Sequence, residues 1–449
     1  MVAKSTEKKT SLEPSEVFCA LGLLIPSKKI RDLVTDNTGG KLILWISTNG
    51  LKEVVKIKPL DPKFKSMFEV SSTLRDKPRN DLIANIVAGF SASIGIKNFI
   101  KNTGYSIDVV NNVYLTGATW PAAVSGFRLK NENSGFDYNS SDMVVDVNGQ
   151  AFYGISLKKK KNVKGADPTI INKSYSTFID GPQFDKQREK LNKIRQSYFP
   201  EIVKRAQKDG IINITGLESM SNEQIWNTKL QKSGSKKVDL INLKGFNNND
   251  NPVDLTDVEG TVKGSDLFDK PKGRKGLRDY INEDLSKDDN KLYQGFNNII
   301  QENAEYFANN LIDIVLKTKM QTKLLANNID GLHFEFALVT GYGDFTYNKR
   351  FPRRSKLILK PAKVIPQHTI LCGLANLASN NEPYMMIYDK EQKESTNAAK
   401  IFYKLSKAGV TILDVQLRYK GDYKQQPQFF ATLSEDFIKQ MYEECVITR

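Results

Sequence analysis

Hydrophobic residues along much of the chain recur with the helical spacing of three or four positions. This period is clear from Asp81 to Lys101, where a helix is expected, with Asp81 near its start. Phe184–Lys208 has a helical and strongly charged pattern, and Leu292–Leu325 is the longest helical pattern in the sequence. The spacing therefore predicts three long helices that are separated by segments of different character.

Short apolar runs between and around these helices predict strands. They occur within residues 17–60, from Ser106 to Leu115, and at residues 331–343. Towards the C-terminus, further apolar runs predict strands at residues 356–360, 384–389, 410–419 and 428–433, and helical patterns cover Ser395–Ala408 and Glu435–Glu444. Because helical and strand patterns are mixed throughout, the expected class is α/β or α+β.

The distribution of these patterns divides the chain into four regions. The first is polar, and the third is rich in Gly, Asn and Asp turns, which is typical of long loops. The expected regions are a flexible tail at 1–16, an N-terminal α/β region at 17–208, a loop-rich insertion at 209–290, and a C-terminal α/β region at 291–449 that completes or packs on the core.

The most informative stretch, Ser141–Lys161, consists of two apolar arms around an Asn-Gly turn. Asn-Gly between apolar runs is a strong hairpin pattern. In a strand with a period of two, Asp142 and Asp146 lie on one face of the first arm. Ser156 and Lys158 share a face of the second arm in the same way. The polar residues of the two arms can therefore meet, but only in one pairing register.

Two registers are open from the sequence. A two-residue turn pairs Val147 with Gln150 and places Asp142 opposite Ile155, so that Ser156 lies on the other face. A three-residue loop pairs Val147 with Ala151 and places Asp142 opposite Ser156. The chemistry described next requires the longer loop or a bulge.

An acid opposite a polar-x-Lys sequence suits metal-assisted cleavage of a phosphodiester. Asp142 would hold Mg²⁺ (or Mn²⁺), with the backbone carbonyl of Leu157 and the carboxylate of Asp146 as further oxygen ligands. Lys158 would orient the attacking water or stabilise negative charge, beside Ser156. The expected catalytic residues are therefore Asp142, Ser156 and Lys158.

Ser141-Asp142, thirteen intervening residues, and Ser156-Leu157-Lys158 together resemble the motif of the PD-(D/E)XK nuclease superfamily. The resemblance covers about a quarter of the chain. It implies a restriction-endonuclease-like core with a central mixed sheet flanked by helices, and metal-dependent cleavage of DNA. The chain departs from the family pattern at Ser156, where an acid is usual. Asp146, Glu69 or Asp81 would have to supply the missing carboxylate.

Composition and charge agree with a nucleic-acid partner. The formal net charge is +15, which favours polyanions and makes DNA the default candidate. The cationic residues expected at such an interface are Lys159, Lys160, Lys161, Lys164, Lys173, Arg418 and Lys420. RNA is an open alternative, because nothing in the sequence distinguishes the sugar. No Gly-x-x-x-x-Gly-Lys-Ser/Thr motif occurs, which disfavours an ATP-driven motor.

The supply of metal-binding and acid-base side chains narrows the chemistry further. The three cysteines are far apart without a Cys-x-x-Cys pair, and the only histidines are His333 and His368. A Cys/His zinc site is therefore disfavoured, and the cysteine usage fits a reducing compartment. The apolar runs are too short to span a bilayer, so no membrane partner and a cytoplasmic location are expected.

Two alternatives stand beside the nuclease hypothesis. In the first alternative, the hairpin is an ordinary amphipathic one, in which Asp142 caps a turn and Lys158 begins a solvated basic run. In the second, the protein is a non-catalytic DNA-binding or virion component on a degenerate nuclease-like fold. Val113–Pro121 and Tyr153–Ser174 are similar to uncharacterised proteins of large tailed bacteriophages, which implies phage DNA metabolism or a place in the virion. The oligomeric state is open, with a homodimer as one option.

Overall fold

The computed structural model describes most of the chain, and the account below is confined to those residues. They are residues 13–35, 40–50, 52, 56–58, 79–105, 107–116, 121–127, 129–130, 137–138, 141–159, 169–212, 216–227, 229–231, 237–239, 254–255, 262–263, 277–316, 328–329, 332–341, 343–346, 356–396, 398–420 and 423–445.

The chain forms two compact units, each assembled from separate stretches of sequence. Unit 1 contains residues Met1–Pro168, Ile314–Ser379 and Ile438–Arg449, and unit 2 contains Thr169–Asp313 and Asn380–Phe437. This division differs from the predicted boundaries at residues 208 and 291. The chain enters unit 2 earlier than expected, and the C-terminal region contributes to both units instead of forming one region.

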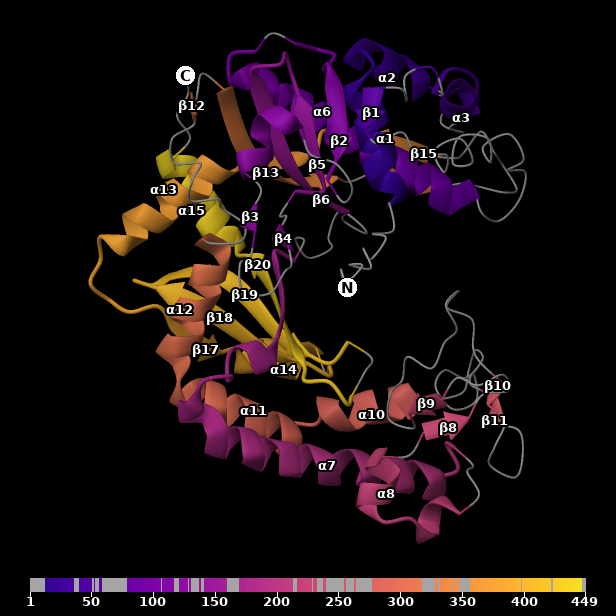
Figure 1. Ribbon diagram of the computed structural model, residues 1–449, viewed down its shortest axis with the longest axis vertical. Helices are drawn as coiled ribbons and strands as arrows, with labels where there is room; N and C mark the ends of the chain where they lie inside the picture. The colour runs from indigo at the N-terminus through magenta and orange to yellow at the C-terminus, as the bar shows by residue number, and fades with distance from the viewer. Residues whose placement is uncertain are drawn as a thin grey trace, which may run out of the picture. The chain divides into compact units, whose positions relative to one another are not determined.

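Unit 1 is organised around a mixed seven-stranded sheet in the part of the chain that is described. Three antiparallel strands follow one another, and a fourth that comes much later in the chain lies parallel to the third (Figure 1). The strands are β1 (Ile57–Lys58), β2 (Asn112–Leu115), β5 (Met143–Asp146), β6 (Ala151–Lys159), β13 (Leu332–Gly341) and β12 (Asn328–Ile329), with β16 (Lys363–Pro366) also paired to β13. A mixed sheet with helices was expected, and the α/β class is confirmed.

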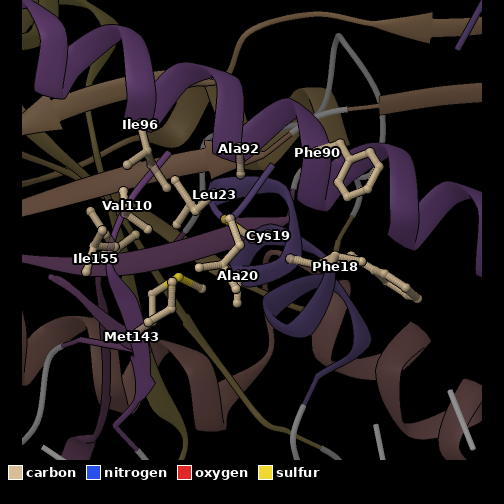
Figure 2. Close-up of a cluster of buried hydrophobic side chains, with 14 of the residues drawn as sticks. Phe18, Cys19, Ala20, Leu23, Phe90, Ala92, Ile96, Val110, Met143 and Ile155 are labelled. Atoms are coloured by element: carbon tan, nitrogen blue, oxygen red, sulfur yellow. The ribbon is translucent and has the colours of Figure 1, made fainter. Parts of the chain in front are cut away.

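Both faces of the central strands are buried, as expected for a sheet between layers. One face carries Met143, Tyr153 and Ile155, which belong to a large hydrophobic cluster with α1 (Pro14–Leu23) and α6 (Arg79–Asn102) (Figure 2). The opposite face carries Val144 and Phe152, which pack with Phe334 and Phe336 of β13. Unit 1 further contains α2 (Ser27–Leu33), α3 (Gly40–Trp45), η1 (Ile46–Gly50), η4 (Ala122–Phe127), α13 (Gln367–Ala378) and the strand pairs β3 (Leu129–Lys130) with β4 (Asp137–Tyr138) and β14 (Gly343–Thr346) with β15 (Lys356–Leu359).

Helices α1 and α6 pack closely because each has a glycine at the contact. A Cβ atom on Gly89 would lie 2.7 Å from both the backbone nitrogen of Cys19 and the carbonyl oxygen of Ser15. A Cβ on Gly22 would lie 2.8 Å from that of Ser93. The absent side chains therefore allow the two helix backbones to approach.

The N-terminal part of unit 1 corrects two predictions. The apolar run after residue 17 was expected to form strands, but it belongs to α1, and Leu42 and Ile43 belong to α3. The expected flexible tail at 1–16 is wrong for its last residues, because α1 begins at Pro14. Nearly all of α1 is buried, so its sequence lacks the polar stripe that identifies a helix by pattern.

Unit 2 is built on a five-stranded antiparallel sheet with helices on one face. Tyr403 donates a hydrogen bond from its hydroxyl to Asn297 of a covering helix at 3.0 Å, and Tyr175, Phe307 and Phe429 form an aromatic cluster beneath it. The strand order is β17 (Met385–Tyr388), β18 (Ile401–Lys407), β19 (Val410–Arg418), β20 (Gln428–Leu433) and β7 (Ile171–Ser174). The covering helices are α11 (Lys291–Glu302) and α12 (Ala304–Ile314), and the unit also contains α7 (Asp185–Lys208), α8 (Asn222–Asn227), α10 (Leu277–Ser286), α14 (Lys390–Thr396), η5 (Tyr175–Thr177), η6 (Pro182–Phe184) and η7 (Leu217–Ser219).

The predicted elements of unit 2 are confirmed in part. Helix α7 and strands β17, β19 and β20 lie where expected. The helix expected over Ser395–Ala408 is wrong, because Ile401–Lys407 is strand β18, with one face buried throughout and Lys404 exposed on the other. The long helix expected from Leu292 is divided at Asn303 into α11 and α12. Much of the predicted insertion at 209–290 lies outside the described residues. Its described parts are α8, α10 and two strand pairs, β8 (Lys229–Gln231) with β9 (Lys237–Asp239) and β10 (Asp254–Leu255) with β11 (Val262–Lys263).

A disulfide joins Cys372 of α13 to Cys445 at the end of α15 (Glu435–Cys445), with their Cα atoms 5.9 Å apart. This pairing corrects the expectation of reduced cysteines, which rested on their separation in sequence. The third cysteine, Cys19, is buried in α1. None of the helices formed by the described residues is both long and apolar enough to cross a membrane.

Candidate active site

The hairpin β5–β6 adopts the register with the three-residue loop. Val147 donates its backbone N–H to the carbonyl of Ala151 at 2.9 Å, and Met143 pairs with Ile155. The loop is Asn148-Gly149-Gln150, and Gly149 has a φ of +81°, which a residue with a side chain rarely adopts. Asp142 therefore lies opposite Ser156, and this prediction is confirmed.

Asp146 and Asn148 hold the loop through their side chains. Asp146 accepts a hydrogen bond from the backbone N–H of Gly149 at 2.7 Å and another from the side-chain amide of Asn112 at 3.3 Å. Asn148 accepts one from the N–H of Ala151 at 2.9 Å. Asp146 thus lies at the end of β5 next to the loop, whereas Asp142 lies just before the first residue of β5, at the opposite end of the strand. The structure gives Asp146 a role in the turn in place of the metal-ligand role expected from the sequence.

Asp142 is held by backbone contacts on both neighbouring strands. Its N–H donates to the carbonyl of Ile155 at 2.7 Å, and its carbonyl accepts from the N–H of Thr116 at 3.3 Å. Its carboxylate oxygen Oδ2 accepts a hydrogen bond from the backbone N–H of Leu157 at 2.6 Å. Leu157 thus contacts Asp142 through its N–H, whereas the sequence had suggested its carbonyl as a metal ligand. These bonds fix the position of one carboxylate oxygen.

Ser156 and Lys158 converge on the same carboxylate oxygen. The hydroxyl of Ser156 donates to Oδ2 of Asp142 at 3.4 Å, and the ammonium nitrogen of Lys158 lies 3.5 Å from it. Ser156 is buried, whereas about 30% of the Lys158 side chain and 27% of that of Asp142 remain exposed. The acid and the amine can therefore both reach a substrate from solvent.

A second acid approaches this pair from a part of the chain that the sequence did not indicate. Partial burial and, as the second cause, the negative charge of Asp142 raise the pKa of Glu16 in α1 to about 7, while Lys158 acts in the opposite direction. Such electrostatic coupling requires the three charged groups to be close together. No pattern in the sequence could have shown this, because Glu16 belongs to a segment that was expected to be disordered.

Two neighbouring carboxylates fit the demands of Mg²⁺. This ion is usually held by one or two carboxylates and keeps several water ligands. Two like charges in a partly buried position are also stabilised by a divalent cation. In the described part of the chain, no group of three or more His, Cys, Asp or Glu side chains is arranged to hold a metal. Glu69 lies outside the described residues, and Asp81 falls in α6 at a position whose side chain is not described.

The cationic residues expected to contact nucleic acid are distributed over both units. Lys159 ends β6 beside the site, and Lys160, Lys161 and Lys164 lie outside the described residues. Arg418 ends β19 and Lys420 is exposed just after it in unit 2. Lys173 of β7 is paired with Phe429, so both side chains lie on the helix-covered face of the sheet. Leu417 also pairs with Phe429, so the next residue, Arg418, lies on the opposite face. Within unit 2, Lys173 is thus separated from Arg418 by the sheet.

The two histidines meet at the other end of β13. His368 hydrogen-bonds through Nδ1 to the carboxylate of Glu335, and Nε2 of His333 lies 3.8 Å from the other oxygen of the same carboxylate. Glu335 is only 5% exposed. Tyr153, which pairs with Glu335 across β6 and β13, packs its ring against His333 at 5.5 Å. The two histidines thus surround the buried carboxylate of Glu335. This cluster is separated along β6 from Ser156, the residue opposite Asp142.

Comparison with known proteins adds no further assignment. No family model, curated protein or solved structure matches the chain. The candidate active site is therefore defined by the hairpin, which brings a carboxylate and a lysine together, and by the effect of the Asp142 charge on Glu16 of α1.

Proposed function

We propose that the protein is a metal-dependent phosphodiesterase that cleaves DNA. The observation that carries this proposal is the register of the β5–β6 hairpin, which places the ammonium of Lys158 3.5 Å from the carboxylate of Asp142. An acid and an amine in one partly exposed position are the groups that hydrolysis of a phosphodiester requires. The net charge of +15 supports a polyanionic substrate.

Each residue has a role in this proposal. Asp142 and Glu16 would hold Mg²⁺ or Mn²⁺, which supplies a Lewis acid for the phosphate and lowers the pKa of a water molecule. Lys158 would leave its ion pair with Asp142 to orient that water or to stabilise charge on the phosphate. The N–H of Leu157 holds Oδ2 of Asp142 in place, and Ser156 donates a second hydrogen bond to the same oxygen.

The architecture of unit 1 supports the resemblance to the PD-(D/E)XK superfamily. That resemblance implied a central mixed sheet with the acid and the lysine on adjacent strands, flanked by helices. Unit 1 has such a sheet, and α1 and α6 cover the face that carries Met143 and Ile155. The charge of Asp142 acts on Glu16 at the start of α1, which makes Glu16 the candidate for the carboxylate that Ser156 lacks.

The proposal is tested with purified protein and supercoiled or linear DNA in the presence of Mg²⁺ or Mn²⁺. Wild type is expected to cleave, and chelation of the metal should stop the reaction. Asp142→Asn and Lys158→Met should each lower the rate by about 100-fold or more. Asp146→Asn is the matched control on the same strand, and it should retain most of the activity. An RNA substrate in parallel determines which sugar is accepted.

Absence of cleavage by wild type would contradict the proposal, and so would equal cleavage by Asp142→Asn. Loss of activity in Asp146→Asn as large as that in Asp142→Asn would also count against it, because the effect would then come from the hairpin and not from the site. The folded state of each variant is checked by circular dichroism.

A second candidate function is a non-catalytic DNA-binding protein on a degenerate nuclease-like fold. The observation in its favour is that Lys158 and Ser156 already satisfy the carboxylate oxygen of Asp142, so that this oxygen needs no cation. This candidate predicts binding to DNA that weakens steeply with salt, and no cleavage. Recovery of the protein from phage particles would favour a virion component, and recovery from the host cytoplasm would favour DNA metabolism.

A further inference from the structure

The sheet of unit 2 has a second face that carries a pair of cations. Phe402, Gln416 and Phe430 occupy consecutive positions across β18, β19 and β20, on the face opposite Tyr403 and Phe429. The guanidinium carbon of Arg418 lies 4.2 Å from the centre of the Phe430 ring, and the ammonium of Lys400 lies 5.9 Å from that of Phe402. Both cations therefore belong to this face.

Lys400 and Arg418 are cross-strand neighbours with the same charge. Ile401 pairs with Leu417, so the adjacent residues Lys400 and Arg418 come opposite each other at the end of the strands. The two charges repel each other: burial is the larger cause that lowers the pKa of Lys400, and the charge of Arg418 lowers it further. Like charges directly opposite each other destabilise a sheet unless something compensates them.

The compensating carboxylates of this sheet lie elsewhere. Asp389 forms an ion pair with Lys404 at 3.2 Å, and Asp414 pairs across the strands with Lys404. Among the described residues, none of the charge interactions identified for Lys400 or Arg418 involves a carboxylate. Among the described residues of this face, the acids thus lie around Lys404, and the two cations lie together at Arg418.

The two cations are held in a partly dehydrated position that remains open to solvent. Burial lowers the pKa of both Lys400 and Arg418, and each side chain is partly exposed. The Nε atom of Arg418 is buried and has no hydrogen-bond partner in the described structure. The aromatic rings beneath them limit the directions in which the two side chains can point. Two preorganised cations, one of which has an unsatisfied donor, are suited to an anion.

We infer that Lys400 and Arg418 form a phosphate-binding site on the face of the unit 2 sheet that carries Phe402 and Phe430. A guanidinium and an ammonium together match a phosphate group, since the guanidinium can donate two parallel hydrogen bonds and the ammonium supplies a point charge. The phosphate can come from a polynucleotide backbone or from a small phosphate such as pyrophosphate. The site is independent of Asp142, so it stands whether or not the protein cleaves DNA.

The experiment measures binding with the full chain carrying Asp142→Asn, in chelator, so that cleavage does not interfere. The probes are a fluorescent single-stranded oligonucleotide, followed by anisotropy, and inorganic pyrophosphate as competitor. Arg418→Gln and Lys400→Gln should each weaken oligonucleotide binding about tenfold or more. Each should also reduce the slope of log affinity against log salt by about one. Lys404→Gln, on the same strand and face, is the matched control and should leave both quantities unchanged.

The competitor distinguishes the two phosphate sources. Displacement of the oligonucleotide by pyrophosphate, lost in Lys400→Gln, indicates a site for small phosphates. Failure of pyrophosphate to compete, with the variant effects intact, indicates a backbone phosphate. The inference is overturned if both variants bind like the parent protein, or if Lys404→Gln weakens binding equally, which would indicate a general charge effect.

A variant that unfolds would not decide the question by anisotropy, so a second measurement is included. The oligonucleotide should raise the melting temperature of the parent protein and of Lys404→Gln, and should raise that of Arg418→Lys less. Arg418→Lys keeps the charge but loses the two-pronged donor. An equal increase in the parent protein, Arg418→Lys and Lys400→Gln would overturn the inference.

Discussion

Glu16 of α1 lies close enough to Asp142, at the start of the β5–β6 hairpin, for the charge of Asp142 to raise its pKa. Burial is the larger cause, and the two together bring the pKa of Glu16 to about 7. A helix and a hairpin that are far apart in sequence thus place two carboxylates around one position. This relationship can be measured without any assumption about catalysis.

The first prediction is a pH dependence of stability that comes from Glu16. Its pKa in the folded protein exceeds the ordinary value of 4.5, so the folded state binds more protons than the unfolded state between pH 4.5 and about 7. Stability should therefore fall as the pH rises through this window, by the order of 2 kcal/mol. Glu16→Gln should lack this fall, and Asp142→Asn should reduce it. Urea unfolding at pH 5 and pH 8 without metal makes the measurement.

The effect of Mg²⁺ on stability tests the same pair of carboxylates. If Mg²⁺ binds between the two carboxylates, it should restore part of the stability that wild type loses at pH 8, and it should leave Glu16→Gln largely unaffected. Asp32→Asn, at an exposed position of α2 whose charge does not contribute to the pKa shift of Glu16, serves as the control and should keep the wild-type profile. A profile of Glu16→Gln identical to that of wild type would remove the basis for a second acid at this site.

The second prediction concerns the contact between α1 and α6. In Gly89→Ala the new Cβ would lie 2.7 Å from two backbone atoms of α1, which cannot move as a side-chain end can. The helices must separate, at a cost of about 1–3 kcal/mol that outweighs the better helix propensity of Ala. The control is Gly295→Ala in α11, whose Cβ would meet only Leu191 at 3.5 Å and Ile194 at 3.7 Å. It should be neutral or stabilising, as measured by urea unfolding.

The same substitution tests how α1 positions the site. Ser15, whose carbonyl is one of the two close atoms, immediately precedes Glu16. Displacement of α1 should move Glu16 away from Asp142 and so lower its pKa towards 4.5. Equal unfolding free energies for wild type and Gly89→Ala would show that the helices are less closely packed than described.

The hairpin could be predicted from the sequence because its evidence is local. Asn148 and Gly149 specify a turn, and the alternation of Asp142 and Val144 specifies which residues share a face. The sequence left two registers open, and the choice between them rests on Asp146 and Asn148, whose side chains accept hydrogen bonds from the loop backbone. A requirement of chemistry, rather than a pattern, pointed to the register that the structure has.

The parts that escaped prediction depend on distant contacts. Phe18–Leu23 is buried on all sides against α6 and the sheet, so its helix has no polar stripe. In Ile401–Lys407 the alternation is obscured, because apolar Phe402 lies on the more exposed face and Lys407 lies on the buried one. Glu16 acquires its significance from Asp142, and Lys400 from Arg418. Pairings of this kind depend on tertiary structure, and no local period records them.

The third prediction concerns the buried carboxylate of Glu335. His368→Ala removes a hydrogen-bond donor from a carboxylate that is only 5% exposed, and should destabilise unit 1 by about 1–3 kcal/mol. In a Glu335→Gln background the same substitution should have a smaller effect, because no buried charge is then left without its partner. A double-mutant cycle by urea unfolding gives the coupling. Equal effects of His368→Ala in both backgrounds would show that the contact contributes no coupling.

The fourth prediction concerns the disulfide between Cys372 and Cys445, which connects α13 to the last turn of α15. The cysteines are separated by 73 residues, so the bond closes a long loop and restricts the unfolded chain. Cys445→Ser should therefore lower the free energy of unfolding by about 2–4 kcal/mol. Addition of dithiothreitol should lower that of wild type by a similar amount and have no effect on the variant.

Thiol titration of the denatured protein checks the pairing directly. Without reductant, wild type should expose the single thiol of Cys19, whereas after reduction all three cysteines should react. Cys372→Ser is the matched variant, because it removes the same bond from the other helix and should reproduce the loss of stability. Three reactive thiols in protein purified without reductant would mean that the bond is absent under those conditions. The end of α15 would then be held to α13 and β16 by non-covalent contacts, such as the hydrogen bond of 2.9 Å from the hydroxyl of Tyr442 to the carbonyl of Val364.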